Sequence, residues 1–344
     1  MDLAELNRVA TAMVAPGKGL LAADESGGTI AKRFAAIDVE STETNRRDYR
    51  ELLFRSTKAM HDHISGVILF DETIRQKAVD GTPLVKIIEQ AGAIPGIKVD
   101  KGAKSLAFCP GETITEGLDG LRERLAEYRE LGARFCKWRA VINIGSGIPT
   151  YDSISSNAHA LARYAALCQE QGLVPIVEPE VLMDGDHTID RCDEVTELVL
   201  KTVFQALFTA RVKLEGMVLK PNMIVPGAKC ATQASDEEIA KKTIRVLKDC
   251  VPSAVPGIAF LSGGQADVEA TARLDAMNKI GGFLWHLTFS YGRALQHAPQ
   301  VAWSGKPENV AAAEAAFSHR AEMNGLATLG KWTPDMESTI AQRS

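Results

Sequence analysis

Short apolar segments that end in polar or glycine-rich sequence recur along most of the chain, and stretches with helical periodicity separate most of them. The pattern predicts eight strands, at residues 19–24, 66–70, 96–99, 135–141, 174–180, 217–221, 258–262 and 287–290. Strands that alternate with helices are typical of a parallel sheet whose faces are covered by helices. Eight such units in roughly 300 residues favour one closed (β/α)8 barrel over an open Rossmann sheet.

The sequence predicts one α/β domain, a TIM barrel over residues 1–324 that begins with an N-terminal helix. Among the helix signals, Ser235 and Glu238 form a capping box, and Gly172 stands where a left-handed C-cap would end a helix that runs from about Ser155. After about Gly325 the alternation stops. Because chain ends fray unless they dock, we expect residues 325–344 to form a mobile C-terminal tail.

Composition argues against nucleic acid and membranes as partners. The chain has 39 Lys and Arg against 44 Asp and Glu, a formal net charge of −5, whereas nucleic-acid-binding faces usually raise the pI above neutrality. The longest stretch without charged residues, 250–266, is interrupted by Pro252 and Pro256 and cannot span a bilayer. Asp2 and Glu5 interrupt the apolar N-terminus, so we expect no cleaved leader and a cytoplasmic protein.

The predicted barrel indicates where chemistry should occur, because the reactive groups of TIM barrels lie at the carboxyl ends of several strands. The predicted strands end at or just before polar groups. These are Asp24, Lys98, Lys137, Arg139, Glu178, Glu180, Lys220, Ser262, Gly263, Gly264, Ser290, Gly292 and Arg293. A candidate site is therefore expected at the mouth of the barrel.

Charged pairs lie on two neighbouring predicted strands. Lys137 and Arg139 are two positions apart, as are Glu178 and Glu180, so both members of a pair point to the same side of the sheet. One interpretation is a buried ion-pair cluster that only stabilises the barrel. The other interpretation starts from Lys220. Like-charge repulsion and desolvation would keep part of this third amine neutral, and a neutral amine can attack a carbonyl.

Glycine-rich sequence and cations at the strand ends predict two anion sites. The segments after the seventh and eighth strands contain Ser262, Gly263, Gly264, Gly292 and Arg293. Barrels commonly bind phosphate there, through backbone N–H groups and an arginine. Across the mouth, Lys98 could hold a second anion together with Ser26 or Thr29. Two anion sites beside a reactive amine predict a carbonyl substrate that carries phosphate.

Motifs for cofactors and metals are not convincing. Residues 17–22 match a degenerate dinucleotide pattern, but they lead into a strand instead of following one. His61 and His63 form the closest histidine pair and precede the second strand, at the opposite end of the barrel from the mouth. The six cysteines are widely spaced, which excludes metal knuckles. We therefore expect neither a metal nor a cofactor.

The segments that carry these residues resemble class I fructose-1,6-bisphosphate aldolase in order and spacing over residues 14–330. They include Leu-Leu-Ala-Ala-Asp24-Glu-Ser, Gly-Ile-Lys98-Val-Asp, Lys137-Trp-Arg139, Pro-Ile-Val-Glu178-Pro-Glu180, Leu-Lys220-Pro-Asn, Phe-Leu-Ser262-Gly-Gly264 and Phe-Ser290-Tyr-Gly-Arg293. The resemblance implies a (β/α)8 barrel that is usually a homotetramer. It also implies catalysis through a Schiff-base lysine and without a metal. It also implies a small phosphorylated sugar as substrate.

The resemblance further implies a role for each position. Lys220 would form the Schiff base, Glu178 would act as general acid and base, and Asp24 would accept the proton of the C4 hydroxyl. Lys137, Glu180 and Arg139 would complete the charged network. Ser262, Gly263, Gly292 and Arg293 would bind the 1-phosphate, and Gly264 and Ser290 would also bind the substrate. Ser26, Thr29 and Lys98 would bind the 6-phosphate.

The C-terminus departs from the best-known animal members of that family, which end in a tyrosine that reaches the active site. This chain ends in Ser344, and its last tyrosine is Tyr291. Two alternatives stay open at this point. One is another Schiff-base barrel, such as a transaldolase or a deoxyribose-phosphate aldolase, and the other is a barrel retained as a scaffold or with a secondary binding role.

Overall fold

The computed structural model describes residues 2–340, which form a closed barrel of eight parallel strands and the helices around it. The strands are β1 (Gly19–Ala23), β2 (Ile64–Leu69), β3 (Ile94–Lys98), β6 (Phe135–Ile142), β7 (Val174–Val181), β8 (Val218–Leu219), β9 (Gly257–Phe260) and β10 (His286–Tyr291). Each barrel strand pairs with the next one along the chain, and β10 closes the barrel against β1. The (β/α)8 barrel that the sequence predicts is confirmed.

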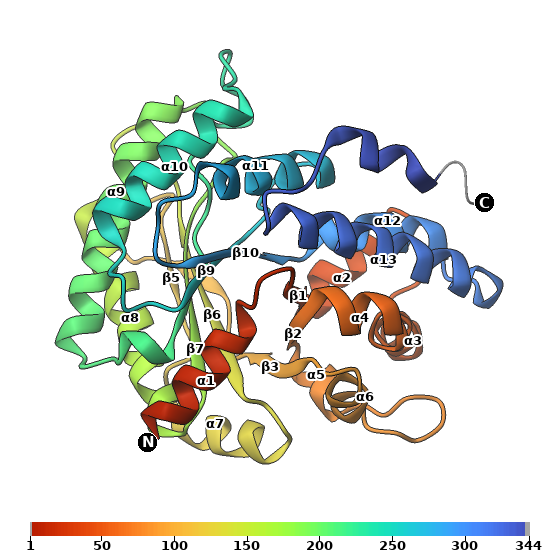
Figure 1. Ribbon diagram of the computed structural model, residues 1–344. Coiled ribbons are helices and arrows are strands. Elements are labelled where there is room, and N and C mark those ends of the chain that lie inside the picture. Colours follow the sequence, from red (N-terminus) through yellow and green to blue (C-terminus); the bar gives the residue numbers. More distant parts are fainter. Residues whose placement is uncertain (1, 341–344) are drawn as a thin grey trace.

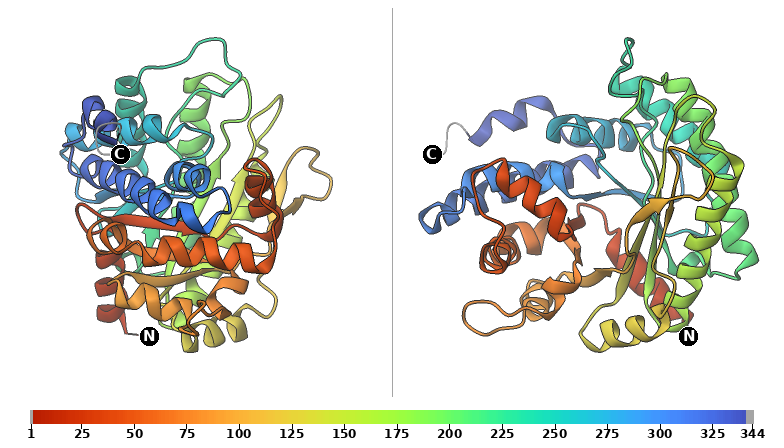
Figure 2. Two further views of the ribbon diagram at one scale, coloured as in Figure 1. Left: turned by 90° about the vertical axis from the view of Figure 1, so that its right-hand side faces the viewer. Right: turned by 180° about the vertical axis from the view of Figure 1, so that it is seen from behind.

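Helices between the strands, and two helices after β10, form the outer layer. They are α2 (Gly27–Ala35), α3 (Glu43–Arg55), α4 (Thr57–His63), α5 (Asp71–Arg75), α6 (Leu84–Gln90), α7 (Leu121–Glu130), α8 (Tyr151–Glu170), α9 (Ile189–Thr209), α10 (Asp236–Cys250), α11 (Asp267–Ile280), α12 (Arg293–Trp303) and α13 (Val310–Ala327). Figures 1 and 2 show these helices around the strands, with α13 next to α3 and α4. None of the helices in the described part of the chain has the length and apolar composition needed to cross a bilayer.

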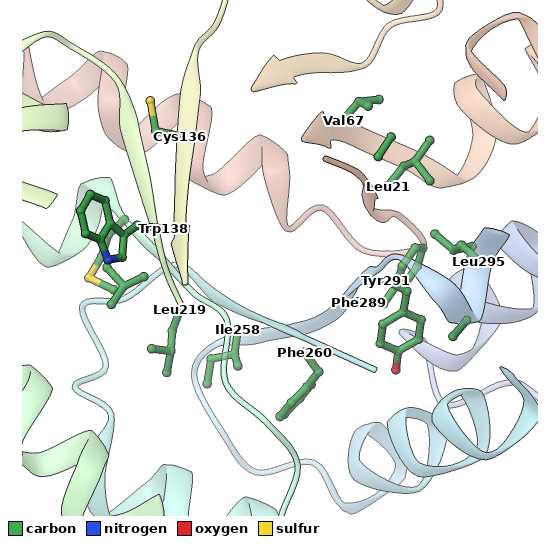
Figure 3. Close-up of a cluster of buried hydrophobic side chains, with 14 of the residues drawn as sticks. Leu21, Val67, Cys136, Trp138, Leu219, Ile258, Phe260, Phe289, Tyr291 and Leu295 are labelled. Carbon is green, nitrogen blue, oxygen red and sulfur yellow. The ribbon is translucent and has the colours of Figure 1, made fainter. Parts of the chain in front are cut away.

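Strand residues that point away from the barrel axis pack against these helices. Leu21, Val67, Trp138, Ile258 and Phe289 come from five different strands and are buried in this layer (Figure 3). Side chains alternate between the two faces of a strand, so every second residue contributes to this outer core. The outer core fixes the strands against the helices that carry their connecting loops.

A second core fills the interior of the barrel near the beginnings of the strands. It contains Leu6, Val9, Ala10, Met13, Val14, Leu20, Ala22, Ile68, Phe135, Val174, Ile176, Val218 and Ala259. The first four of these belong to α1 (Leu3–Met13), which therefore packs against the amino-terminal end of the barrel. Gly96 leaves room for the Phe135 ring, because a Cβ at Gly96 would lie 2.2 Å from that ring.

The inward positions change from apolar to charged toward the carboxyl ends of the strands. In β6, Phe135 belongs to the interior core, whereas Lys137 and Arg139 line the cavity at the mouth. In β8, Val218 belongs to the core, and Lys220 follows two positions later in the cavity lining. The period of two in a strand thus carries one row of side chains from the apolar interior to the mouth.

Three local details differ from the sequence-based expectation. An antiparallel hairpin of β4 (Ala103–Ser105) and β5 (Thr113–Thr115) lies between β3 and α7. Its strands are short and β4 is exposed, so no apolar run indicated it. The sixth barrel strand was predicted over residues 217–221 but comprises only Val218–Leu219. Pro221 lies beyond its end and has no N–H group to donate to a neighbouring strand. Helix α8 begins before Ser155, because Thr150 caps it by accepting from the Ser153 N–H at 3.2 Å.

The C-terminal segment packs on the helices of the barrel. The predicted domain boundary after residue 324 falls inside α13, and the Trp332 ring beyond the helix is buried. The Trp332 indole N–H donates to Glu337 Oε1 at 2.9 Å. The same carboxylate pairs with Arg320, and its Oε2 lies 3.1 Å from His319 Nε2. Glu337 belongs to η3 (Pro334–Ile340). Residues 341–344 of the predicted tail lie outside the described residues, and the mobility of the tail stays a prediction.

Candidate active site

A cavity of 370 Å³ opens at the carboxyl ends of the barrel strands. The residues that the sequence analysis assigned to the site line this cavity, with the exception of Gly264. They are Asp24, Ser26, Thr29, Lys98, Lys137, Arg139, Glu178, Glu180, Lys220, Ser262, Gly263, Ser290, Gly292 and Arg293. Residues from distant parts of the sequence therefore meet in one cavity, because the barrel brings the ends of its parallel strands to one side.

Four charged side chains form a row in the buried part of the cavity. Lys220 Nζ lies 3.2 Å from Glu178 Oε1, and Glu178 Oε2 lies 3.3 Å from Lys137 Nζ. Lys137 Nζ is in turn 2.7 Å from Asp24 Oδ2. Both lysine side chains are only 5% exposed. The row alternates in sign, so each buried charge has an opposite charge next to it.

This alternation changes the pKa of two of the four groups. Burial raises the pKa of Asp24, but attraction to Lys137 and Lys220 outweighs burial and lowers that pKa to about 2. Burial lowers the pKa of Lys137, and its two carboxylate neighbours, Asp24 and Glu178, raise that pKa above its ordinary value. At neutral pH Asp24 is therefore a carboxylate and Lys137 an ammonium group.

The sequence pattern placed other cations near Lys220, and the structure adds a carboxylate next to its amine. The Glu178 carboxylate lies between Lys220 and Lys137 and faces both amines. The strand pattern revealed which residues point into the barrel, but it did not reveal that a carboxylate separates the two amines. What the geometry offers instead is proton transfer, since a carboxylate 3.2 Å from Lys220 Nζ is within reach of its proton.

A second set of ion pairs lies around this row. Arg139 pairs with Glu180, and the Arg139 backbone N–H donates to Asp100 Oδ2 at 3.3 Å. The other oxygen of Asp100 lies 2.7 Å from Lys98 Nζ. Asp100 lines the cavity and is buried, yet the sequence analysis did not single it out. Its position two residues after Lys98 was the signal that could have identified it.

The segments after β9 and β10 contact each other directly. Arg293 donates from Nη2 to the carbonyl oxygens of Gly264, at 2.6 Å, and of Gln265, at 2.7 Å. Gly263 has a φ of 55°, a left-handed conformation that glycine adopts readily. The hydroxyl of Ser290 is buried at the cavity and has no hydrogen-bond partner among residues 2–340. This side of the cavity thus combines a glycine-rich turn, a guanidinium and an available hydroxyl.

The segment after β1, the neighbour of β10 in the barrel, continues the lining. The hydroxyls of Ser26 and Thr29 lie 3.2 Å apart. Arg33, one helical turn after Thr29 on α2, also lines the cavity and pairs with Glu25. A Cβ added to Gly292 would lie 3.5 Å from Arg33 Nη2, so this guanidinium reaches the segment after β10. The sequence analysis missed Arg33 and Glu25. Arg33 could have been found, because Thr29 and Arg33 are four residues apart and so lie on one face of a helix.

Metal ligands do not gather in the described part of the chain. No group of three or more His, Cys, Asp or Glu side chains within residues 2–340 is arranged to hold a metal ion. His61 and His63 lie at the end of α4, just before β2, and His61 Nδ1 is 2.8 Å from Asp62 Oδ1. The chemistry that the cavity offers is that of a buried amine beside carboxylates, with cations around it.

Comparison with known proteins gives matches over nearly the whole chain. The family model described as fructose-bisphosphate aldolase class-I matches residues 5–344. A probable fructose-bisphosphate aldolase class 1 of Xanthomonas campestris pv. campestris is 59% identical over 333 residues, which are 96% of this chain and 99% of the relative. Cytosolic fructose-bisphosphate aldolase 4 of Arabidopsis thaliana is 54% identical over 323 residues, 94% of this chain and 82% of the relative.

A solved structure is similar over nearly the whole chain. It is fructose-bisphosphate aldolase from Plasmodium falciparum, crystallised in complex with TRAP and a small molecule inhibitor. Its TM-score is 0.94 at 49% sequence identity, and the match covers 96% of this chain and 96% of that one.

Proposed function

The chain belongs to the class I fructose-bisphosphate aldolase family, and from that premise we propose how its own residues carry out the reaction. The family cleaves fructose 1,6-bisphosphate reversibly into dihydroxyacetone phosphate and glyceraldehyde 3-phosphate, through a lysine Schiff base and without a metal. The observation that carries the proposal is the buried Lys220 amine 3.2 Å from the Glu178 carboxylate. Lys220 is the proposed nucleophile.

The covalent stage begins with the ketose carbonyl. The Glu178 carboxylate first takes a proton from the Lys220 ammonium group. The neutral nitrogen attacks C2, and a proton moves from that nitrogen to the carbonyl oxygen, which gives a neutral carbinolamine. Glu178 then supplies a proton to the C2 hydroxyl, which leaves as water, and the nitrogen keeps its bond to C2 as a protonated iminium. The distance from Glu178 to Lys220 supports this assignment, because an acid must reach the group that it protonates.

Cleavage follows from the iminium, which draws electrons from the C3–C4 bond. When that bond breaks, its electron pair moves toward C2 and leaves a neutral enamine on Lys220. The C4 hydroxyl gives its proton to Asp24 and becomes the aldehyde of glyceraldehyde 3-phosphate. The low pKa of Asp24 keeps it ionised before the reaction. Protonation of the enamine at C3 and hydrolysis of the iminium then release dihydroxyacetone phosphate.

The two phosphates are assigned to two different sets of residues at the mouth. We assign the 1-phosphate side to Ser262, Gly263, Gly264, Ser290, Gly292 and Arg293. The buried Ser290 hydroxyl and the nearby Arg293 guanidinium support this assignment. The 6-phosphate is assigned to Ser26, Thr29 and Lys98. The remaining charged pair, Arg139 and Glu180, holds the side of the cavity between the two phosphates.

We also propose that the protein is a cytoplasmic homotetramer. Resemblance to the family supports the tetramer, and the Arabidopsis relative is named as cytosolic. Light scattering after gel filtration should give the mass of four chains. A monomeric mass at micromolar concentration would contradict this part of the proposal.

Borohydride trapping tests the nucleophile. Reduction in the presence of dihydroxyacetone phosphate should convert the iminium into a stable secondary amine, which peptide mass mapping should locate on Lys220. The Lys220→Arg variant serves as the matched control, because it keeps the positive charge and should trap nothing. An adduct on any other lysine would contradict the mechanism. Activity should also survive EDTA, and strong inhibition that zinc reverses would favour a metal-dependent enzyme.

A further inference from the structure

Gln265 lies directly behind the segment that we assign to the 1-phosphate. Its side chain is 2% exposed and is not part of the cavity lining. The amide nitrogen Nε2 donates to the carbonyl oxygen of Ser262 at 3.0 Å, and the Gln265 backbone N–H donates to that same oxygen at 3.0 Å. One residue thus makes two hydrogen bonds to the beginning of the Ser262, Gly263 and Gly264 turn.

The other end of the Gln265 amide is anchored to neighbouring helices. Its Oε1 accepts a hydrogen bond from Arg273 Nη1 at 2.8 Å. Arg273 lies on α11, and its Nε donates to Asp236 Oδ1 at the start of α10, at 2.9 Å. The Arg273 side chain is 12% exposed, so the connection is largely shielded from water. The turn is therefore tied to α10 and α11 through a chain of side-chain hydrogen bonds.

Gln265 also contacts the second half of the anion site. Its backbone carbonyl accepts from Arg293 Nη2 at 2.7 Å, next to the bond from the same nitrogen to the Gly264 carbonyl. Arg293 follows β10, whereas Ser262 follows β9. Both halves of the proposed 1-phosphate site thus meet at Gln265, which lies outside the cavity lining.

We propose that Gln265 is a positioning residue that sets the geometry of the 1-phosphate site, and this rests on the proposed function. An amide suits this place because it donates to a carbonyl oxygen with one end and accepts from a guanidinium with the other. A side chain without these two bonds would free the turn from α11. It would leave Arg273 Nη1 without its acceptor, and the Ser262 carbonyl would keep only the backbone N–H of Gln265. The backbone N–H groups of the turn would then no longer be held toward the phosphate.

The test compares a substrate that has a phosphate with one that lacks it. The variant is Gln265→Met, which keeps the length of the side chain but makes neither hydrogen bond. We measure borohydride trapping on Lys220 as a function of the concentration of dihydroxyacetone phosphate or of unphosphorylated dihydroxyacetone. The half-saturating concentration of dihydroxyacetone phosphate should rise about tenfold, the scale of one lost hydrogen bond. The half-saturating concentration of unphosphorylated dihydroxyacetone should stay unchanged. A general loss of structure would raise both.

Gln169 provides a matched control at the opposite end of the barrel. It is also 2% exposed, and its amide nitrogen donates to the backbone carbonyls of Lys213, at 2.7 Å, and Gly216, at 3.2 Å. Gln169→Met should lower the melting temperature without changing the ratio of the two half-saturating concentrations. An equal change of this ratio in the two variants would overturn the proposal.

A second variant keeps the proposal testable if Gln265→Met does not fold. Arg273→Lys keeps the positive charge but loses the planar fork that reaches Gln265 and Asp236 together. It should raise the half-saturating concentration of dihydroxyacetone phosphate relative to that of dihydroxyacetone by about threefold. An unchanged ratio in a folded variant overturns the role of Gln265 while leaving Lys220 as nucleophile. Failure of the unmodified protein to form an adduct on Lys220 would instead overturn the proposed function itself.

Discussion

Lys220 and Lys137 share one carboxylate, because Glu178 turns one oxygen toward each amine. Asp24 then balances Lys137 from the other side. Removal of one member of such a buried row leaves its neighbour without part of its counter-charge, which is usually more damaging than loss of a surface ion pair. Conservative substitutions that keep the size of the side chain are therefore the useful probes of this site.

Asp24→Asn should separate the two covalent stages. The variant keeps the shape of the side chain but cannot accept the C4 hydroxyl proton, so C3–C4 cleavage should fall by roughly 100-fold. Schiff-base formation with dihydroxyacetone phosphate should persist, because Glu178 remains next to Lys220. Trapped adduct and steady-state cleavage are measured on the same preparation. Equal losses in both would assign Asp24 to Schiff-base formation.

Glu178→Gln should have the opposite profile. It removes the acid that we assign to dehydration of the carbinolamine, so the rate of adduct formation on Lys220 should itself fall. Rapid-quench borohydride trapping measures that rate directly. A normal trapping rate combined with slow cleavage would transfer the acid and base role to another group.

Substitutions at the two phosphate sites should discriminate between substrates. Arg293→Ala should raise KM for both fructose 1,6-bisphosphate and fructose 1-phosphate, since a charge-assisted bond to phosphate contributes about 1.5–3 kcal/mol. Lys98→Ala should raise KM for the bisphosphate alone. Steady-state cleavage of both substrates provides the measurement. If Lys98→Ala impairs both substrates equally, the 6-phosphate assignment is wrong.

The sequence was informative about charged residues on strands and less informative about those beside them. Lys137 and Glu178 could be identified because a strand has a fixed period of two. Arg33 and Glu25 come after β1, where the period changes to that of a helix, and the argument from strands did not extend to them. The strand order places Glu178 between the strands of Lys137 and Lys220, but the contact of each Glu178 oxygen with one amine was not predictable, because it depends on side-chain conformation.

At the scale of elements, the strands and main helices were predictable and the small additions were not. The hairpin of β4 and β5 has three residues in each strand and lacks the apolar alternation that reveals longer strands. The C-terminal segment was equally hard to predict. Its partners, His319 and Arg320, lie on α13, and only the folded chain brings Glu337 to them.

Deletion of the residues after Thr333 tests that segment. The deletion removes Glu337 and leaves the Arg320 guanidinium, whose side chain is 5% exposed, without its carboxylate. Stability should fall by roughly 3 kcal/mol, the scale for a broken buried ion pair. Glu337→Gln serves as the control for the charge alone. Urea unfolding measures both variants.

The same deletion should have little effect on proton exchange at C3 of dihydroxyacetone phosphate. The reason is that the tail has no tyrosine to assist that step. Exchange of the C3 proton into deuterated water, followed by NMR, is the measurement. If exchange is abolished while the fold and the Schiff base persist, some other group of the tail must reach the cavity.

At the scale of the whole molecule, the buried charges should make stability depend on pH. The pKa of Asp24 is lowered from 3.8 to about 2 in the folded protein by Lys137 and Lys220, against the opposing effect of burial. A carboxylate with a lowered pKa stabilises the fold fully above its unfolded-state pKa, and this contribution is lost as the pH falls toward the folded-state pKa. The relevant window therefore extends from about pH 4 down to about pH 2.

Asp24→Asn lacks this contribution. The difference in unfolding free energy between the unmodified protein and the variant should therefore shrink as the pH falls through that window. Urea titrations at several pH values measure this difference. A difference that stays constant from pH 4 to pH 2 would show that the Asp24 pKa is ordinary in the folded state.

The apolar interior and α1 have a consequence for the movement of protons. Leu20, Phe135 and Val174 fill the barrel below the charged row, and α1 packs beneath them. Because such a packed core does not conduct water or protons, exchange with the solvent takes place through the mouth. A bound sugar phosphate would lie in that route, so we expect the charged row to exchange protons with the solvent more slowly when substrate is bound than when the cavity is empty. The mouth of the barrel, and not its amino-terminal end, should therefore set the rate at which the charged row exchanges protons with the solvent.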